Sequence, residues 1–267
     1  MSKHRSFRER YGPWAIVTGA SSGIGEEFAR QLAARGLHVV LVARRLDRME
    51  VLASELRSAH GVEARVLSLD LGQPADVASL PAQVADLDVG LLVNNAGFGD
   101  KGSFVDIPLE RHLEMLAVNV RAPLALTHAL AARLVARGRG GIVFTSSTAA
   151  FQATPYTAHY AATKGYELQL AEALWHELRP AGVDVLALCP GATDTEGPRR
   201  TGVDPSRVPV RMMAVGPVVS AALAGLGAVP VVVPGLVNRL GVLAVRLMPR
   251  ATAAGLAGRL IRRSIGR

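Results

Sequence analysis

The stretch Trp14-Ala-Ile-Val-Thr-Gly-Ala-Ser-Ser-Gly-Ile-Gly25 places three glycines directly after a short apolar run. The run, residues 14–18, is typical of a buried strand, and residues 26–35 have the amphipathic pattern of a helix. A strand, a glycine turn and a helix in this order form the context of a dinucleotide-binding loop. The glycines let the backbone approach a pyrophosphate, and the helix N-terminus offers free N–H groups. The spacing G-x-x-x-G-x-G differs from the common G-x-G-x-x-G. The candidate cofactor-binding residues of this loop are Gly19, Ser21, Ser22, Gly23, Ile24 and Gly25.

A second informative stretch, residues 147–164, contains a possible acid/base site. Tyr160 and Lys164 are four residues apart, so on a helix they share one face. An ammonium group beside a phenol stabilises the phenolate, which makes the phenol a better acid and base near neutral pH. A serine hydroxyl upstream can hydrogen-bond the same reacting oxygen, and both Ser146 and Ser147 are candidates. Tyr156 competes less well because it has no lysine four residues on.

Apolar runs alternate with amphipathic stretches along most of the chain. The expected strands are 14–18, 38–43, 63–68, 89–93, 141–146, 183–188 and 230–233. The expected helices are 24–35, 46–60, 74–86, 109–137, 157–179 and 216–227. Strands this continuously apolar suit a parallel sheet buried on both faces, and their regular alternation with helices indicates a doubly wound α/β fold. The sequence predicts one such domain with a seven-stranded parallel sheet at residues 1–235, followed by a helical extension at residues 236–267.

Composition and charge exclude several classes of protein. An apolar content of 49% over 267 residues supports a full core and excludes a disordered chain. The lone cysteine, Cys189, excludes an internal disulfide, and the seven histidines form no metal pattern, so we expect no metal. The first ten residues lack the apolar segment of a secretory signal, which predicts a cytoplasmic protein. The net charge of +8 is concentrated at the two ends, which indicates a local basic surface and argues against nucleic-acid binding.

Taken together, these motifs resemble those of the classical short-chain dehydrogenases/reductases. The matching residues follow the family's order and, roughly, its spacings: Thr18 to Gly25, Asp70, Asn94-Asn-Ala-Gly97, Asn119, Ser147, Tyr160, Lys164 and Pro190-Gly191. The resemblance covers residues 12–235 and is strongest, within the family, to the branch with 3-oxoacyl-thioester reductases and steroid dehydrogenases. It implies a single Rossmann-like domain that moves hydride between a nicotinamide cofactor and a carbonyl or alcohol.

The resemblance also implies roles for individual residues. In this chain Asn119, Ser147, Tyr160 and Lys164 would be catalytic, with a water bound near Asn119 linking Lys164 to solvent. The family interval of thirteen residues to the tyrosine selects Ser147 over Ser146. Asp70 would bind the adenine, and Thr195 matches a threonine that contacts the nicotinamide amide, with Thr193 as the nearby alternative. The remaining cofactor-binding candidates are Leu71, Asn95, Ala96, Gly97, Pro190 and Gly191.

The end of the second expected strand indicates which nicotinamide cofactor is used. An enzyme that binds NAD places an acidic residue there to hold the ribose hydroxyls. This chain has Ala43, followed by Arg44 and Arg45. Because a guanidinium can bind a 2′-phosphate through two hydrogen bonds, the sequence favours NADP (NADPH). One feature departs from the pattern, since some NADP-binding members carry a basic residue where this chain has Ser22.

The region after residue 211 is apolar, and the end of the chain is basic. No charged residue lies between Arg211 and Arg239, but three prolines interrupt this segment, so we do not expect it to span a membrane. By resemblance it holds a substrate lid, residues 196–228, and the last strand; its apolar composition favours a lipophilic substrate. Residues 239–267 contain seven arginines and no acidic residue. This extension is expected to pack on the domain or on a second subunit of a homo-oligomer, or to contact an anionic membrane at its periphery.

The sequence therefore predicts an NADP-dependent oxidoreductase acting on a lipophilic ketone or a 3-oxoacyl-type substrate. Two other classes are alternatives: a non-catalytic, NADP-binding regulator and a membrane-surface adaptor on the same scaffold. The complete set of serine, tyrosine, lysine and asparagine favours the enzyme.

Overall fold

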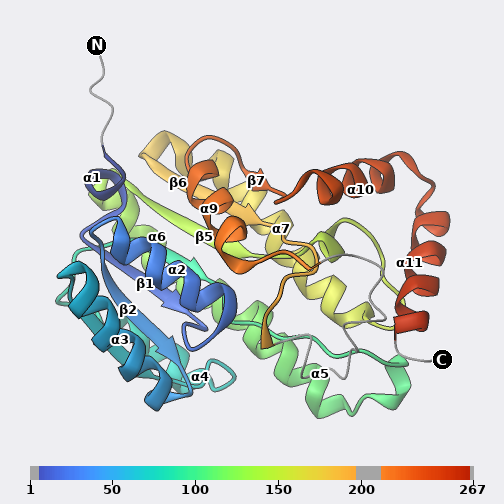
Figure 1. The fold of residues 1–267 in the computed structure, drawn as a ribbon, viewed down its shortest axis with the longest axis horizontal. Coiled ribbons are helices and arrows are strands. Elements are labelled where there is room, and N and C mark those ends of the chain that lie inside the picture. Colours follow the sequence, from blue (N-terminus) through green and yellow to red (C-terminus); the bar gives the residue numbers. More distant parts are fainter. Residues whose placement is uncertain (1–5, 197–211, 265–267) are drawn as a thin grey trace.

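A computed structural model of the protein describes residues 6–196 and 212–264. Seven parallel strands form one sheet in the order β3-β2-β1-β4-β5-β6-β7 (Figure 1). Their bounds are Trp14–Thr18 (β1), His38–Ala43 (β2), Ala64–Ser68 (β3), Val89–Asn94 (β4), Gly140–Thr145 (β5), Val183–Leu188 (β6) and Val231–Val232 (β7). The predicted doubly wound, seven-stranded parallel sheet is confirmed; the third strand is one residue shorter than predicted and the last strand two residues shorter.

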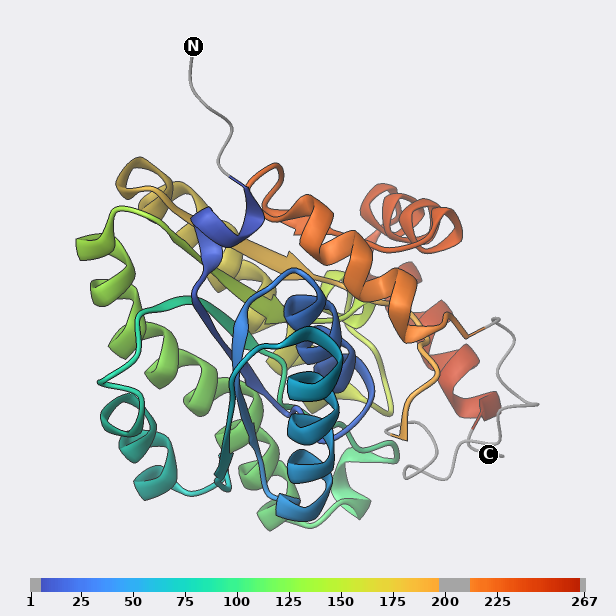
Figure 2. The same cartoon turned by 60° about the vertical axis from the view of Figure 1, so that its left-hand side comes forward.

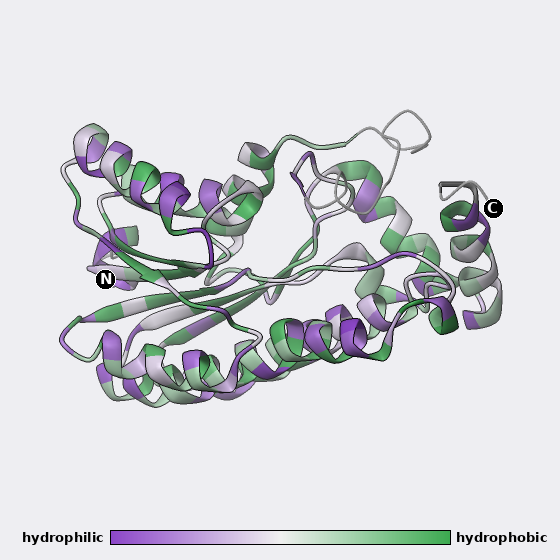
Figure 3. Ribbon diagram, turned by 90° about the horizontal axis from the view of Figure 1, so that it is seen from below, coloured by the Kyte–Doolittle hydropathy of each residue, from purple (hydrophilic) through white to green (hydrophobic). Residues whose placement is uncertain are grey.

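Helices connect these strands and pack on both faces of the sheet. Their bounds are Phe7–Tyr11 (α1), Gly23–Ala34 (α2), Leu46–His60 (α3), Pro74–Gln83 (α4), Leu109–Leu116 (α5), Ala122–Arg137 (α6), Ala158–Leu178 (α7), Val215–Gly225 (α9), Leu236–Leu247 (α10) and Arg250–Ser264 (α11). Shorter helical turns are Phe104–Asp106 (η1), Thr148–Phe151 (η3) and Arg179–Ala181 (η4). In Figure 3 the strands run between two layers of helices.

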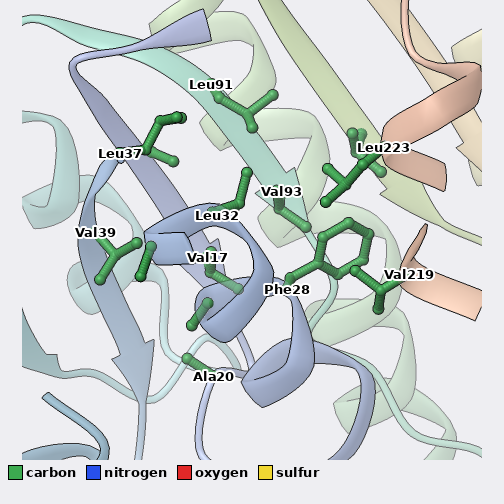
Figure 4. Close-up of a cluster of buried hydrophobic side chains, with 14 of the residues drawn as sticks. Val17, Ala20, Phe28, Leu32, Leu37, Val39, Leu91, Val93, Val219 and Leu223 are labelled. Atoms are coloured by element: carbon green, nitrogen blue, oxygen red, sulfur yellow. The ribbon is translucent and has the colours of Figure 1, made fainter. Parts of the chain in front are cut away.

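The strand sequences explain the two layers, because successive side chains point to opposite faces. On β1, Val17 packs with Phe28 and Leu32 of α2 and with Val219 of α9 (Figure 4). The intervening Ile16 belongs to the other cluster, which includes residues from α4, α6 and α7. Figure 2 shows α2, α3 and α9 on the near side of the sheet and α6 behind it. Every residue of β1 and β4 is buried, as expected for a parallel sheet covered on both faces.

The strand order reverses between β1 and β4. β1 pairs with both β2 and β4, so the chain winds outward in opposite directions from this point. In open α/β sheets, ligands bind beyond the carboxyl ends of the strands at such a switch point. The glycine loop after β1 and the Asn94-Asn-Ala-Gly97 turn after β4 both lie there.

The stretch predicted as one helix at residues 109–137 is interrupted in its middle. Residues Ala117–Arg121 (η2) form a π-helical turn between α5 and α6, with the buried Asn119 at its centre. Such turns insert one extra residue per turn and often occur at functional sites. Leu109–Arg137 is also the one described helical stretch that is long and apolar enough to cross a membrane. Its buried residues Leu126, Leu130 and Leu134 instead pack in the protein core.

The C-terminal part of the chain confirms the predicted helical extension. The uncharged segment folds, where described, into α9 and β7, and Val218, Val219 and Ala222 are buried in the core. α10 and α11 follow and lie on the side of the molecule away from α3 (Figure 1). Of the lid predicted at residues 196–228, residues 197–211 lie outside the described part of the chain.

Candidate active site

The glycine loop and the turn after β4 are held together by Thr18. Its Oγ1 donates a hydrogen bond to the Val93 carbonyl at 3.2 Å and accepts from the backbone N–H groups of Asn95 and Ala96 at 2.9 and 3.0 Å. The Asn95 side chain donates in return to the Thr18 carbonyl at 2.9 Å. One hydroxyl at the end of β1 therefore positions both loops, so Asn95 and Ala96 lie beside the glycine motif as expected.

The loop glycines are required by the close approach of neighbouring backbone. Gly19 has a φ of +67°, and a Cβ there would lie 2.9 Å from the Ala96 Cα. A Cβ on Gly25 would collide with the Gly19 carbonyl. A Cβ on Gly23 would lie 3.0 Å from the Thr195 Cγ2, so Thr195 faces the N-terminus of α2. A cavity of about 280 Å³ opens between these two segments and is lined in part by Ser22, Gly23 and Thr195. These residues fit a pyrophosphate, which needs free backbone N–H groups and no bulky side chains beside them.

The two predicted arginines differ in their surroundings. Arg45 donates to the hydroxyls of Ser21 and Ser22 at 2.9 and 2.7 Å, and it pairs with Glu196 at 2.8 Å. Glu196 also pairs with Arg48, and these two arginines lower the pKa of the Glu196 carboxyl to about 2. The Arg44 side chain is 64% exposed and lies 4.0 Å from Glu114. A guanidinium beside two hydroxyls at the end of β2 is a set of donors that fits a phosphate.

Asp70 and Leu71 lie two and three residues beyond β3. The Asp70 carboxylate accepts from the Gly72 N–H at 2.9 Å, and its own N–H donates to Asp76 at 2.8 Å. Leu71 is buried. The turn is thus fixed at the same edge of the sheet as the glycine loop, where the sequence predicted an adenine contact.

Tyr160 and Lys164 lie on the first two turns of α7, as predicted. The Lys164 Nζ lies 6.0 Å from the centre of the Tyr160 ring. The ring packs directly on Gly99, where a Cβ would lie 2.5 Å from the Tyr160 Cδ2. A Cβ on Gly97 would lie 3.1 Å from Nζ and 3.2 Å from the Asn119 Oδ1. The turn after β4 therefore passes over the tyrosine and the lysine, and its glycines permit this contact.

Asn119 is fully buried and held by three hydrogen bonds. Its Nδ2 donates to the Phe98 carbonyl at 2.8 Å and to the Thr163 Oγ1 at 3.0 Å, and its Oδ1 accepts from the Phe98 N–H at 3.1 Å. The side chain thus connects the π-helical turn to α7 and to the turn after β4. This arrangement places Asn119 near Lys164, and its side-chain amide forms hydrogen bonds with the backbone of Phe98.

Ser147 lies at the end of β5 and caps η3, where its Oγ accepts from the Ala149 N–H at 3.1 Å. The rival Ser146 is buried and donates to the Lys164 carbonyl at 2.7 Å, so its hydroxyl is committed to α7. The Thr148 N–H donates to the Pro190 carbonyl at 3.0 Å, which connects this segment to Pro190-Gly191. The geometry favours Ser147 as the hydroxyl available to a ligand, in agreement with the interval in the sequence.

The remaining threonine alternative is also distinguished by geometry. The Thr193 hydroxyl donates to the Gly191 carbonyl at 3.0 Å and the residue is buried, whereas Thr195 faces Gly23. Gly191 itself lies against Asn238 in the first turn of α10, and a Cβ there would require the Asn238 side chain to move. The C-terminal extension is therefore in direct contact with the predicted cofactor site.

Glu167 is the residue of this site that the sequence reasoning missed. It is buried on α7 and accepts from the Lys164 Nζ with both oxygens, at 2.9 and 3.1 Å. The available signal was its position three residues after the lysine, next to Leu168 on the apolar face of the helix.

The family model for the short chain dehydrogenases matches residues 13–204 of this chain. The chain belongs to the short-chain dehydrogenase family. This short-chain dehydrogenase is 35% identical over 190 residues to the 7beta-hydroxysteroid dehydrogenase of Collinsella aerofaciens, covering 71% of this chain and 72% of the relative. It is 40% identical over 179 residues to the very-long-chain 3-oxoacyl-CoA reductase of Podospora anserina, covering 65% of this chain. The chain spans only about half, 53%, of that fungal relative.

Solved structures of the family superimpose over most of the dehydrogenase. A structure of a 7beta-hydroxysteroid dehydrogenase has a TM-score of 0.86 at 30% identity and covers 95% of this chain and 99% of its own. A short-chain dehydrogenase from Sphingobium yanoikuyae in complex with NADPH has a TM-score of 0.81 at 37% identity, covering 88% of this chain and 93% of its own. The predicted family and its steroid and 3-oxoacyl branch are thus confirmed, and the chain is an oxidoreductase of this class.

Beside Tyr160, a small cavity of about 20 Å³ separates the dehydrogenase's α7 from the segment that precedes α5. Phe104, Ile107 and Met115 give it an apolar wall, and Asp100 and His112 add polar groups. The buried Asp100 Oδ2 and His112 Nδ1 have no hydrogen-bond partner among the described residues. The cavity is therefore mostly, but not wholly, apolar.

Proposed function

We propose that this chain is an NADP-dependent carbonyl reductase and alcohol dehydrogenase of lipophilic ketones or 3-oxoacyl-type substrates. The observation that carries the proposal is the grouping of Tyr160, Lys164 and Asn119 under the Gly97–Gly99 turn, with Ser147 at the adjoining end of β5. These four residues come from three segments of the chain: the π-helical turn, the end of β5 and α7. Asn119 donates to the Phe98 carbonyl, Lys164 to the Thr145 carbonyl and Ser146 to the Lys164 carbonyl, and these bonds hold the segments together.

The roles of these residues follow from their chemistry. A bound nicotinamide would supply or accept the hydride. In the reducing direction, Tyr160 gives its phenolic proton to the carbonyl oxygen, and Ser147 donates a hydrogen bond to the same oxygen. Lys164 stabilises the phenolate that remains, because its ammonium lies on the same side of α7. Asn119 fixes the backbone over this group and supports return of the proton from solvent.

The preference for NADP over NAD rests on the end of β2. Arg45, Ser21 and Ser22 offer several hydrogen-bond donors there, and no carboxylate of β2 faces them, since the strand ends at Ala43. Glu196 is paired with Arg45 and Arg48. A 2′-phosphate carries more negative charge than this carboxylate and would replace it beside the arginines. The NADPH complex of the Sphingobium yanoikuyae relative supports the same choice.

The substrate class rests on the wall beside Tyr160 and on the relatives. The aromatic and aliphatic side chains of this wall favour a lipophilic molecule. A ketone with an apolar body suits such a wall better than a short, polar one. Relatives named for steroid and 3-oxoacyl-CoA chemistry support the proposal.

A cofactor-oxidation screen tests the proposal. Purified protein is mixed with NADPH or NADH and with a panel of steroid ketones, 3-oxoacyl thioesters and short polar ketones. We expect NADPH oxidation with the bulky lipophilic members at a rate at least ten times that with the short polar ones. NADPH binding without turnover of any member would favour the non-catalytic regulator instead.

We also infer that the outer face of α10 is covered by a second copy of this chain. Leu236, Val237, Leu240, Leu243 and Leu247 on α10 are 54–79% exposed, an unusually apolar surface for a monomer. Arg239 and Arg246 flank this face, so an anionic membrane is the alternative occupant. Light scattering and vesicle sedimentation separate the two.

A further inference from the structure

Lys164 is paired with a buried carboxylate that has no part in the reaction described above. The side chains of Lys164 and Glu167 are 5% and 2% exposed. The ammonium has three N–H bonds, and three acceptors lie within reach: the Thr145 carbonyl at 2.8 Å and both Glu167 oxygens at 2.9 and 3.1 Å. The lysine is therefore fully hydrogen-bonded between the end of β5 and its own helix.

This ion pair lies in a buried part of the molecule. Leu168 and Ala171 on α7 and Cys189 after β6 are buried nearby. Burial raises the pKa of the Glu167 carboxyl to about 7, because the loss of water outweighs the attraction of Lys164. The titratable groups that act on the pair are Tyr160 on α7 and Cys189, whose thiol burial keeps protonated by raising its pKa to about 12. Glu172, also on α7, acts on Cys189 in the same sense.

We propose that Glu167 is a positioning residue for the reaction: it holds the Lys164 ammonium against the end of β5 and offsets its charge, and so sets how readily Tyr160 gives up its proton. The inference rests on the proposed roles of Tyr160 and Lys164. An ammonium acts on a phenol through its net field, and a carboxylate less than 3.2 Å away cancels much of that field.

Two consequences follow from this arrangement. With Glu167 ionised, Tyr160 keeps its proton to higher pH than it would beside an uncompensated ammonium. With Glu167 protonated or removed, the phenolate becomes the nearest anion for the ammonium, and the Tyr160–Lys164 pair loses a proton more easily. Glu167 therefore raises the pH at which the site gains a catalytic base.

The test is a titration of the Tyr160 phenolate by ultraviolet difference absorbance, with no substrate or cofactor present. Each protein is compared with its own Tyr160→Phe counterpart, so that the other tyrosines cancel. The proteins are the wild type, Glu167→Gln, Glu167→Asp and Glu177→Gln. Glu177 is exposed on the same helix, about 15 Å along the axis from Glu167, and its replacement removes the same charge at a distance.

We expect Glu167→Gln to move the midpoint roughly one pH unit to the acid side, Glu167→Asp to move it less, and Glu177→Gln to leave it unchanged. A folded Glu167→Gln protein with the wild-type midpoint overturns the proposal, as does an equal shift in Glu177→Gln. If Glu167→Gln does not fold, Glu167→Asp decides, and a wild-type midpoint there overturns it. Because the titration needs no turnover, failure of the proposed reaction is recognised separately, by the substrate screen.

Discussion

Ser146 donates a 2.7 Å hydrogen bond to the Lys164 carbonyl oxygen, and this bond joins the end of β5 to α7. It places the next residue, Ser147, on the segment that faces the tyrosine and lysine of the helix. Ser146 therefore helps to fix the placement of Ser147 relative to Lys164, the two residues proposed to be catalytic.

Replacing Ser146 by alanine should affect turnover more than stability. The bond contributes about 1 kcal/mol, since the helix carbonyl keeps its partner within the helix. Loss of alignment should nonetheless reduce kcat about tenfold, because small displacements of reacting groups are costly. Ser79→Ala is the matched control, as the Ser79 hydroxyl makes a 2.8 Å bond to the Asp76 carbonyl on the remote α4. Thermal melts and kcat of both variants check this, and equal effects on kcat would contradict it.

Changes at the end of β2 should alter the choice of cofactor. Arg45→Ala removes the guanidinium beside Ser21 and Ser22, so NADPH affinity should fall at least tenfold, or about 1.4 kcal/mol, while NADH affinity changes little. Ala43→Asp should reverse or abolish the preference, because a carboxylate repels the 2′-phosphate. Fluorescence titration with both cofactors measures this. Tighter binding of NADH than NADPH by the wild type would refute the assignment.

The buried Glu167 should make stability depend on pH in an unusual direction for a carboxyl group. Its pKa is raised to about 7 in the folded protein from the ordinary value of 4.5. A carboxyl with a raised pKa contributes stability below the unfolded value and loses it as the pH rises to the folded value. The melting temperature of Glu167→Gln relative to the wild type should therefore increase between pH 4.5 and 7. A constant difference across that range would show that Glu167 ionises normally.

Charge placed on the outer face of α10 should dissociate the proposed homo-oligomer. Leu240→Asp and Leu243→Asp introduce carboxylates on exposed positions, so the fold should be kept while association is lost. Multi-angle light scattering should show a smaller mass for the double variant than for the wild type. Wild-type protein that is monomeric but sediments with anionic vesicles at low salt, and not at high salt, would assign the face to a membrane instead.

The sequence predicted the fold well because its strands are buried on both faces. Runs such as Trp14–Thr18 and Val183–Leu188 are continuously apolar, and glycines or polar turns bound them, so their limits agree with the structure to within one residue. The π-helical turn at Asn119 could not be predicted in the same way. Its residues have the same apolar spacing as the helices on either side, and its hydrogen bonds to Phe98 and Thr163 link distant parts of the chain.

The candidate site likewise has features that the sequence predicted and features that it could not predict. Tyr160, Lys164 and the glycine loop depend on local spacing, which the sequence contains. The pairing of Lys164 with Glu167 was visible as an i, i+3 pair, but surface pairs have the same spacing, and only the burial of α7 distinguishes them. The ion pair between Arg45 and Glu196 joins residues that are 151 positions apart, and no local sequence pattern indicates such a contact.

Tyr160→Phe tests the central claim most directly. The variant keeps the ring that packs on Gly99 but has no proton to give, so NADPH should bind with its wild-type affinity while single-turnover reduction of the best substrate slows by at least a thousandfold. Stopped-flow loss of NADPH absorbance, with cofactor affinity measured in parallel, provides both values. Reduction by Tyr160→Phe within tenfold of the wild-type rate would contradict the assignment of Tyr160 as the proton donor.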